Sequence, residues 1–447
     1  MPLPEDQEKE TPRAKRQHIR RTEADARRWA DKFREGKSML RIAQEDGTDP
    51  KLVSDWLRRL GITTKQGSHR VSQPTLSLGA EVVELAMMGT AKVEALIRER
   101  VWGVSASGIG LSQLDKFCKF VVMHSEGKGV EETAGVLGVH RSTILGWRSG
   151  EDLPYLMKVA VVAKSKHLEP GWKILPIHLG SGGNTQSDWV EVPESIRVFD
   201  DLARVVAQLP FLQEAKELAD GFGIKTLDEI RLDLVGYLLA MMSGDSSKSG
   251  GIQERFASMG LDLQLSLKRN SNERLGKYVC MCANTIGIKM KRISDKQPTG
   301  DSKYSQTPTG AYRWVSERSP LLAWMFSVCM GLGWEERTSY DPLKMDWIFS
   351  APFSFRLRFV QGLADSDAGV KPSEVVVTSV PNAEFVTKLL LSLGMTSAHT
   401  IIEGGVPLRT MVNRREASHL PIFNEHVKGY RYDALVKEGI RPSKYGI

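Results

Sequence analysis

Two related stretches decide the fold that this sequence predicts: DLVGYLLAMMSGDS at Asp233–Ser246 and RFVQGLADSDAGV at Arg358–Val370. Each is an apolar segment about three helical turns long that ends on a carboxylate. These carboxylates are Asp245 and Asp367, which are 122 positions apart (367 minus 245). We interpret the two stretches as matching helices of a duplicated core.

Small residues four positions apart mark one face of each predicted helix. They are Ala240 and Gly244 in the first helix and Gly362 and Ser366 in the second. Faces of this kind let two helices pack with their backbones unusually close. We therefore expect the two faces to meet, which would bring the two carboxylates out side by side at the helix ends.

A carboxylate at a helix C-terminus is mildly destabilising, because that end already carries partial negative charge, and a second carboxylate adds repulsion. A divalent cation between Asp245 and Asp367 would relieve this repulsion, and oxygen-only ligands suit Mg²⁺. Either aspartate alone could instead be a polar residue that opens a turn. The two copies together favour a Mg²⁺ site in which both aspartates are metal ligands and catalytic groups.

At these positions the sequence resembles the LAGLIDADG family of homing endonucleases. Laid on Leu238–Ser246 and Val360–Ala368, the nine-letter motif puts Asp245 and Asp367 at its second acidic position, which binds metal in that family. The first copy departs from the motif with Ser243 at the first acidic position, and neither copy keeps the final glycine. The resemblance implies an α+β fold with two αββαββα halves, at residues 228–335 and 345–430.

The resemblance also implies that antiparallel sheets lay a polar face in the major groove of double-stranded DNA. LDLQLSLK at Leu261–Lys268 alternates strictly between apolar and polar residues, although a polar face that only meets water would look the same. The candidate DNA-binding residues here are Gln264, Lys268, Arg409, Asn413 and Arg415. Of these, Gln264, Lys268 and Arg409 are also candidates for assisting the attacking water.

The remaining core elements follow from apolar periodicity and from turn residues. Helices are expected at Asn272–Ile286, Pro320–Leu332, Ala383–Leu393 and Phe423–Lys428, and strands at Ile288–Ser294, Gly310–Glu317, Ser373–Val380, His399–Glu403 and Leu408–Arg414.

Residues 21–64 predict a helix-turn-helix unit. Ala43, Gly47, Val53 and Trp56 have its spacing, with a small residue where helices cross, glycine in the turn and two apolar anchors under the recognition helix. That recognition helix, expected at Pro50–Leu60, offers side chains for DNA contact at Lys51, Ser54, Arg58 and Arg59.

The same spacing recurs 91 positions later (134 minus 43), within residues 107–150, as Ala134, Gly138, Ile144 and Trp147. Two matches at one offset indicate an internal duplication. The second recognition helix offers Arg141, Ser142, Thr143 and Arg148. Its N-terminal residues are the expected base readers, and its arginines are suited to phosphate contact. Protein contact is the alternative use of such units.

Other segments connect these parts. They are a basic arm at residues 1–20, a helical connector at 75–105, a connector with a β-hairpin and helices at 151–227, and a C-terminal tail at 431–447. The hairpin, within 165–195, is expected from WKILPIHL at Trp172–Leu179 and WVEVP at Trp189–Pro193, and nothing in the sequence indicates its use.

The 447 residues are enough for two to four domains, and the net charge of +7 favours an anionic partner. The N-terminus is charged where a signal peptide would be apolar, and the longest apolar run, Leu234–Met242, is half a membrane span. The four cysteines include no CxxC pair. We expect a cytoplasmic, DNA-associated protein without membrane contact, monomeric and with an internal pseudo-two-fold axis.

Together these features predict a sequence-specific double-stranded DNA-binding protein that hydrolyses phosphodiester bonds with Mg²⁺, as a homing-type endonuclease. A transcriptional regulator that binds DNA on the same scaffold without cutting it is the alternative, favoured by the degenerate first motif and the two extra DNA-binding units. An RNA-binding maturase with this fold is a third reading. Retention of both aspartates favours cleavage.

Overall fold

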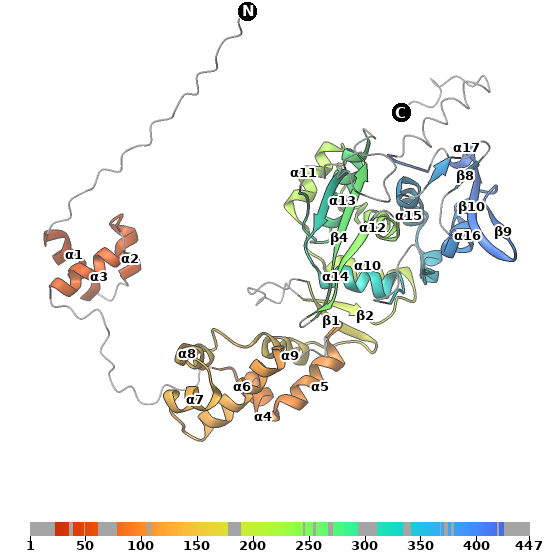
Figure 1. Ribbon diagram of the computed structural model, residues 1–447. Coiled ribbons are helices and arrows are strands. Elements are labelled where there is room, and N and C mark those ends of the chain that lie inside the picture. Colours follow the sequence, from red (N-terminus) through yellow and green to blue (C-terminus); the bar gives the residue numbers. More distant parts are fainter. Residues whose placement is uncertain are drawn as a thin grey trace, which may run out of the picture. The chain divides into compact units, whose positions relative to one another are not determined.

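Figure 1 shows the protein as a computed structural model. The structure describes residues 23–34, 39–48, 50–60, 78–104, 109–177, 189–244, 246–253, 256–266, 271–293, 311–333, 341–366, 368–370, 374–376, 380–417 and 420–423. The chain divides into two compact units, Met1–Leu76 and Ser77–Ile447. Helices and small antiparallel sheets occur together, so the architecture is α+β, as expected.

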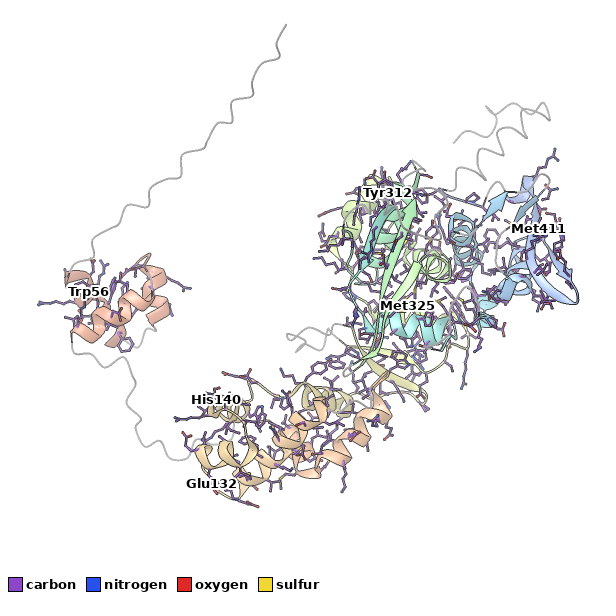
Figure 2. The ribbon with its side chains drawn as sticks, viewed as in Figure 1. Trp56, Glu132, His140, Tyr312, Met325 and Met411 are labelled. Carbon is purple, nitrogen blue, oxygen red and sulfur yellow. The ribbon has the colours of Figure 1, made fainter. Side chains whose placement is uncertain are left out.

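The first unit contains three short helices, α1 (Glu23–Arg34), α2 (Met39–Glu45) and α3 (Pro50–Arg59). Gly47 lies between α2 and α3 with φ of 58°, a left-handed conformation that glycine adopts without strain. Val53 is buried, as predicted, but the second anchor of α3 is Leu57, which is fully buried. The predicted anchor Trp56 (Figure 2) is only partly buried, because one position along a helix turns a side chain by about 100°.

The helices α6 (Ile109–Ser125), α7 (Val130–Leu137) and α8 (Arg141–Ser149) repeat this turn at the 91-position offset. Gly138 has φ of 59°, close to the 58° of its counterpart. The N–H of Thr48 donates to the carbonyl of Ala43 at 2.9 Å, and the N–H of Val139 donates to the carbonyl of Ala134 at 3.1 Å. The two turns therefore share backbone conformation and hydrogen bonding, as a duplication predicts.

Both predicted anchors of α8 are buried, Ile144 at 1% exposure and Trp147 at 4%. The rings of Phe117 and Phe120 on α6 lie 5.5 and 5.7 Å from the ring of Trp147. Aromatic packing of this kind contributes beyond the apolar area that it buries. It fixes α8 on α6.

A connecting region links these helices to the core. Its elements are α4 (Ala80–Met88), α5 (Thr90–Arg100), α9 (Tyr155–Ser165), β1 (Trp172–Pro176), β2 (Trp189–Pro193), α10 (Phe199–Gln208) and α11 (Gln213–Gly221). The predicted hairpin is present as the antiparallel pair β1–β2. Val101, after α5, forms a parallel bridge with Ile174 of β1, and the indole N–H of Trp324 donates to the carbonyl of Pro193 at 3.1 Å. The hairpin thus contacts both the helical region and the core.

The core repeats one order of elements twice. The first half contains α12 (Arg231–Ser243), β3 (Ser246–Gln253), β4 (Phe256–Ser266), α13 (Ser271–Asn284), β5 (Met290–Arg292), β6 (Ala311–Ser316) and α14 (Pro320–Trp324). The second half contains α15 (Phe353–Ser366), β7 (Gly369–Val370), β8 (Glu374–Val376), α16 (Ala383–Ser392), β9 (His399–Glu403), β10 (Val406–Asn413) and α17 (Arg414–Ala417). The sheets have the matching strand orders β3-β4-β6-β5 and β7-β8-β10-β9. In Figure 1 the α12–α15 pair lies between the two sheets.

Some core elements differ from the sequence prediction. The sequence does not predict β3, because SSKSGGIQ lacks apolar alternation, yet all eight of its residues pair with β4. The helix expected at Pro320–Leu332 is α-helical only to Trp324 and continues as a π-helical turn at Met325–Cys329. The strand expected at Ser373–Val380 covers Glu374–Val376 among the described residues. The helix expected at Phe423–Lys428 lies outside them after residue 423.

The described helices include none that is long and apolar enough to span a membrane.

Candidate functional site

Helices α12 and α15 pack with their backbones in close contact. A Cβ atom built on Gly362 would lie 2.6 Å from the Cβ of Ala240 and 2.9 Å from the carbonyl oxygen of Tyr237. One built on Gly236 would lie 3.0 Å from the carbonyl oxygen of Phe355. Both positions thus lack room for a side chain. The expected meeting of Ala240 with Gly362 is confirmed.

Contacts along the pair show that the two helices run parallel. Near their first turns, the hydroxyl of Ser354 donates to the carboxylate of Asp233 at 3.0 Å. About two turns later, Ala240 meets Gly362. The contacts advance in the same direction along both helices, so the two C-terminal ends lie at one end of the pair.

Asp245 and Asp367 lie outside the described residues, directly after these C-terminal ends. Helix α12 ends at Ser243 and helix α15 ends at Ser366. The facing pair in the middle of the helices, positions 240 and 362, is 122 positions apart (362 minus 240), which is also the separation of the two aspartates. The register of the helix pair therefore matches the register of the two motifs.

Asp365 is a buried carboxylate that the sequence analysis does not single out. It is 2% exposed, and its Oδ2 accepts hydrogen bonds from the Tyr237 hydroxyl at 2.7 Å and from the Ile422 N–H at 3.0 Å. Its Oδ1 accepts one from the Phe423 N–H at 2.7 Å. A buried carboxylate is costly without such donors. Asp365 therefore joins α15 to α12 and to the segment 420–423, and both of its oxygens are engaged in doing so.

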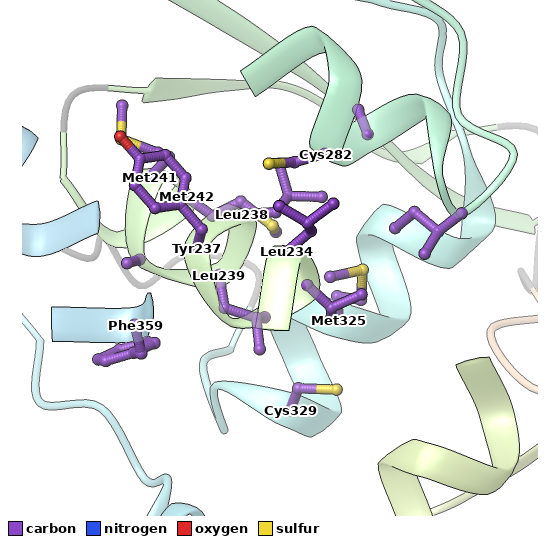
Figure 3. Close-up of a cluster of buried hydrophobic side chains, with 14 of the residues drawn as sticks. Leu234, Tyr237, Leu238, Leu239, Met241, Met242, Cys282, Met325, Cys329 and Phe359 are labelled. Carbon is purple, nitrogen blue, oxygen red and sulfur yellow. The ribbon is translucent and has the colours of Figure 1, made fainter. Parts of the chain in front are cut away.

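The two halves differ at this position. The counterpart of Asp365 is Ser243 (365 minus 122), whose hydroxyl donates to the carbonyl of Ala240 at 2.7 Å within its own helix. Figure 3 shows Tyr237 among buried apolar side chains of α12 that include Leu238, Leu239 and Met242. Burial and the neighbouring Asp365 carboxylate raise the pKa of Tyr237 well above its usual value, so the phenol stays a proton donor.

Replacing Tyr237 with Phe should destabilise the protein by about 1–3 kcal/mol, because Asp365 would lose a donor in a buried site. Urea unfolding of both proteins measures this difference. Tyr312, a partly exposed tyrosine of β6, is the matched control, and Tyr312→Phe should change stability by less than about 0.5 kcal/mol. Equal effects of the two changes would show that the Tyr237–Asp365 contact contributes nothing.

The polar face of the first sheet carries an amide and an ion pair. Gln264 of β4 is exposed and lies directly opposite Arg313 of β6. The carboxylate of Asp262 accepts from the Nε of Arg313 at 2.9 Å and also from its Nη2. Lys291 of β5 is exposed on the neighbouring strand. Lys268 lies outside the described residues.

Arg313 and Lys291 are not among the residues predicted from the sequence to contact DNA. A signal for Arg313 exists in AYRWVS at Ala311–Ser316, where the arginine alternates with the buried Trp314 and so must point to the opposite face. Lys291 has a comparable signal in IKMKRIS at Ile288–Ser294, where it alternates with the buried Ile288 and Met290.

In the second sheet, Arg409 and Asn413 lie on β10, and Arg415 follows in α17. A guanidinium nitrogen of Arg409 is 3.9 Å from a carboxylate oxygen of Glu403, and the side-chain oxygen of Asn413 accepts from the Arg415 N–H at 2.9 Å. Thr410 points to the other face, where its hydroxyl donates to a carbonyl of α16 at 2.6 Å. Arg409 and Asn413 are thus on the open face, and the water-assisting candidates Gln264 and Arg409 belong to different sheets.

The α8 residues predicted to contact DNA are all at least partly exposed to solvent. Arg141 and Ser142 are exposed, and Thr143 and Arg148 are partly exposed. The Nε of Arg141 is 3.0 Å from a carboxylate oxygen of Glu131 on α7. In the first unit, Arg59 is exposed with its guanidinium 5.1 Å from the ring centroid of Trp56. The structure does not describe the side chains of Lys51, Ser54 and Arg58.

Within the described ranges, no group of three or more His, Cys, Asp or Glu side chains is arranged to hold a metal ion. The predicted Mg²⁺ ligands are the two aspartates that follow α12 and α15, outside those ranges.

No protein-family model matches this sequence, and neither does any curated protein. Among solved structures, mesophilic variants of the homing endonuclease I-DmoI are similar over 45% of this chain and 98% of theirs, with a TM-score of 0.30 and 12% identity. I-DmoI in complex with DNA and Mn is similar over 42% of this chain and 96% of its own, with a TM-score of 0.29 and 14% identity. Values this low do not assign a fold or an activity.

Proposed function

We propose that this protein binds double-stranded DNA at specific sites and cuts it in a Mg²⁺-dependent, homing-type endonuclease reaction. The observation that carries the proposal is the parallel α12–α15 pair, with Gly362 packed against Ala240. Each helix of this pair is the first element of an αββαββα half and is followed in the sequence by an acidic residue. This arrangement best supports a metal site shared between the two halves at the common end of the pair.

In this proposal Asp245 and Asp367 supply one carboxylate each, from two polypeptide segments held in register by the helix pair. A bound Mg²⁺ would polarise the scissile phosphate, lower the pKa of the attacking water and stabilise the leaving oxygen. Asp365 acts beside them as a structural group, because its carboxylate oxygens accept from Tyr237 and from two backbone amides. The proposed ligand set therefore excludes it.

The open faces of the two sheets are the proposed DNA-binding surfaces. Gln264 and Arg313 lie side by side on one of them, and Arg409 and Asn413 lie on the other. Glutamine and arginine suit base edges in the major groove, since each can form paired hydrogen bonds to adenine and guanine respectively. The Asp262 carboxylate holds the Arg313 guanidinium in one orientation, which reduces the entropy lost on binding.

For the attacking water, Gln264, Lys268 and Arg409 remain the proposed assisting residues. Gln264 and Arg409 come from opposite halves, so that each could serve one strand of a duplex.

A DNA-binding regulator is the second candidate function, and a difference between the halves favours it. The first motif has Ser243 where the second has the buried Asp365. Ser243 forms a hydrogen bond within its own helix, whereas Asp365 accepts one from Tyr237 of the other helix. A scaffold whose two helix ends differ in this way could still bind DNA through its sheets and its two proposed helix-turn-helix units.

The proposal is tested by selection from a randomised duplex pool. Full-length protein first captures duplexes without divalent metal, and Mg²⁺ is then added to the complexes. We expect recovery of a defined sequence followed by strand cleavage. Recovery of a defined duplex that stays intact in Mg²⁺ would support the regulator instead, and failure to recover any sequence would exclude both functions.

Replacing both Arg141 and Arg148 with Ala should weaken binding of the selected duplex and flatten its salt dependence. Each phosphate contact contributes about 0.9 to the slope of log K against log salt, so the loss of two should reduce the slope by about 1.8. Binding titrations across a salt series measure this. Arg98→Ala removes one positive charge from α5, where the side chain pairs with Glu94, and as a control it should leave the slope unchanged. An unchanged slope in the double variant would assign α8 to protein contact.

A further inference from the structure

The outward face of α8 has an apolar side chain at its centre. At about 100° per residue, Leu145 projects midway between Arg141 and Arg148 on one side and Ser142 and Ser149 on the other. Leu145 is 44% exposed, so it is not needed for the core. The opposite side of the helix carries the two buried anchors described above.

The surroundings of Leu145 complement a nucleic-acid groove. Helix α8 contains no acidic residue, and its two arginines lie together at neighbouring angles on one side of the leucine. The side chain of Glu131 on α7 holds Arg141 in place beside it. His140 (Figure 2) caps the N-terminus of α8, because its Nδ1 accepts from the N–H of Ser142 at 3.2 Å.

We propose that Leu145 contacts the 5-methyl group of a thymine in the major groove and makes α8 selective for a T·A pair. The inference rests on the proposed DNA binding and adds a base preference to it. The thymine methyl is the apolar group that the major groove presents, and a leucine between polar neighbours can bury it without leaving a hydrogen-bonding group unpaired.

The same position in the first unit is Ser54 (145 minus 91), which can pair with either a donor or an acceptor on a base. The duplicated units therefore differ in sequence at this position. A duplex target would then contain two dissimilar half-sites, and the half-site that α8 contacts would contain the thymine.

Uracil substitution tests this inference, because uracil differs from thymine only by the missing methyl group. A duplex recovered from a randomised pool by the full-length protein is resynthesised with each thymine replaced singly by uracil. At one position we expect about fourfold weaker binding, the fold-change for losing one buried methyl group. Leu145→Ser should bind the thymine and uracil duplexes equally, with unchanged thermal unfolding.

Val136→Ser is the control, since Val136 is an aliphatic residue of α7 with 66% exposure, off the outward face of α8. This variant should keep the full uracil effect. Sequence-specific binding in which no thymine shows the effect would overturn the inference alone, as would persistence of the effect in Leu145→Ser. If no duplex is recovered at all, the proposed DNA binding fails, and the inference fails with it.

Discussion

Asp245→Asn and Asp367→Asn, each made alone, should abolish Mg²⁺-dependent cleavage of a duplex that the parent protein cuts. An amide keeps the shape of the side chain but removes the charge that holds the cation. The loss should exceed about 100-fold in the single-turnover rate at saturating protein, since outer-shell partners of a metal alone account for roughly 10–100-fold.

Binding and stability separate this loss from misfolding. DNA affinity in the absence of metal should survive either change. Stability should hold or rise, because removing one of the two carboxylates that we propose to lie together at the helix C-termini would relieve repulsion. Asp228→Asn removes the same charge from an exposed position ahead of α12 and should cut at the parental rate. If either test substitution unfolds the protein, the two aspartates are structural and the proposed site is wrong.

Gly362→Ala should destabilise the protein by about 1–3 kcal/mol, because the added methyl group would meet the Cβ of Ala240 and the carbonyl of Tyr237. This effect opposes the gain of about 1 kcal/mol that alanine brings to an ordinary helix position. Gly135→Ala in α7 is the matched control, since a Cβ there meets nothing within 4 Å. Chemical denaturation should show opposite signs for the two changes.

A second substitution tests the contact itself. In the Gly362→Ala protein, Ala240→Gly would remove the opposing methyl group, so the two changes together should cost less than the sum of their separate effects. Recovery should be partial, because the Tyr237 carbonyl remains in the way. Strict additivity would mean that α12 and α15 do not meet at these residues.

Much of the fold could be predicted from local sequence pattern. The spacing of Ala43 and Gly47, repeated at Ala134 and Gly138, predicts two turns that the structure shows with the same φ at both glycines. The small residues of the two motifs predict the contact between Ala240 and Gly362. These features succeed because helix crossings and left-handed turns constrain residue type at the position itself.

Other features depend on partners far along the chain. Asp365 is bonded to groups 128, 57 and 58 positions away, so its role as a buried structural acid has no local signature. Strand β3, rich in serine and glycine, forms because β4 offers it a full antiparallel register. The spacing predicts Trp56 as the second anchor of α3, whereas the structure buries Leu57 one position later. Both residues are apolar, so packing decides between them and spacing does not.

The most direct test of a shared metal site at the end of the α12–α15 pair is sequencing of the DNA ends that full-length protein makes from a randomised duplex pool in Mg²⁺. Parent protein should yield ends at a fixed position within one recovered sequence, and it should yield none in EDTA. The Asp245→Asn, Asp367→Asn double variant, which should still capture the same sequence, should yield none in either condition. If the parent and the double variant produced the same DNA ends in equal amounts, the proposal of a shared metal site would be contradicted.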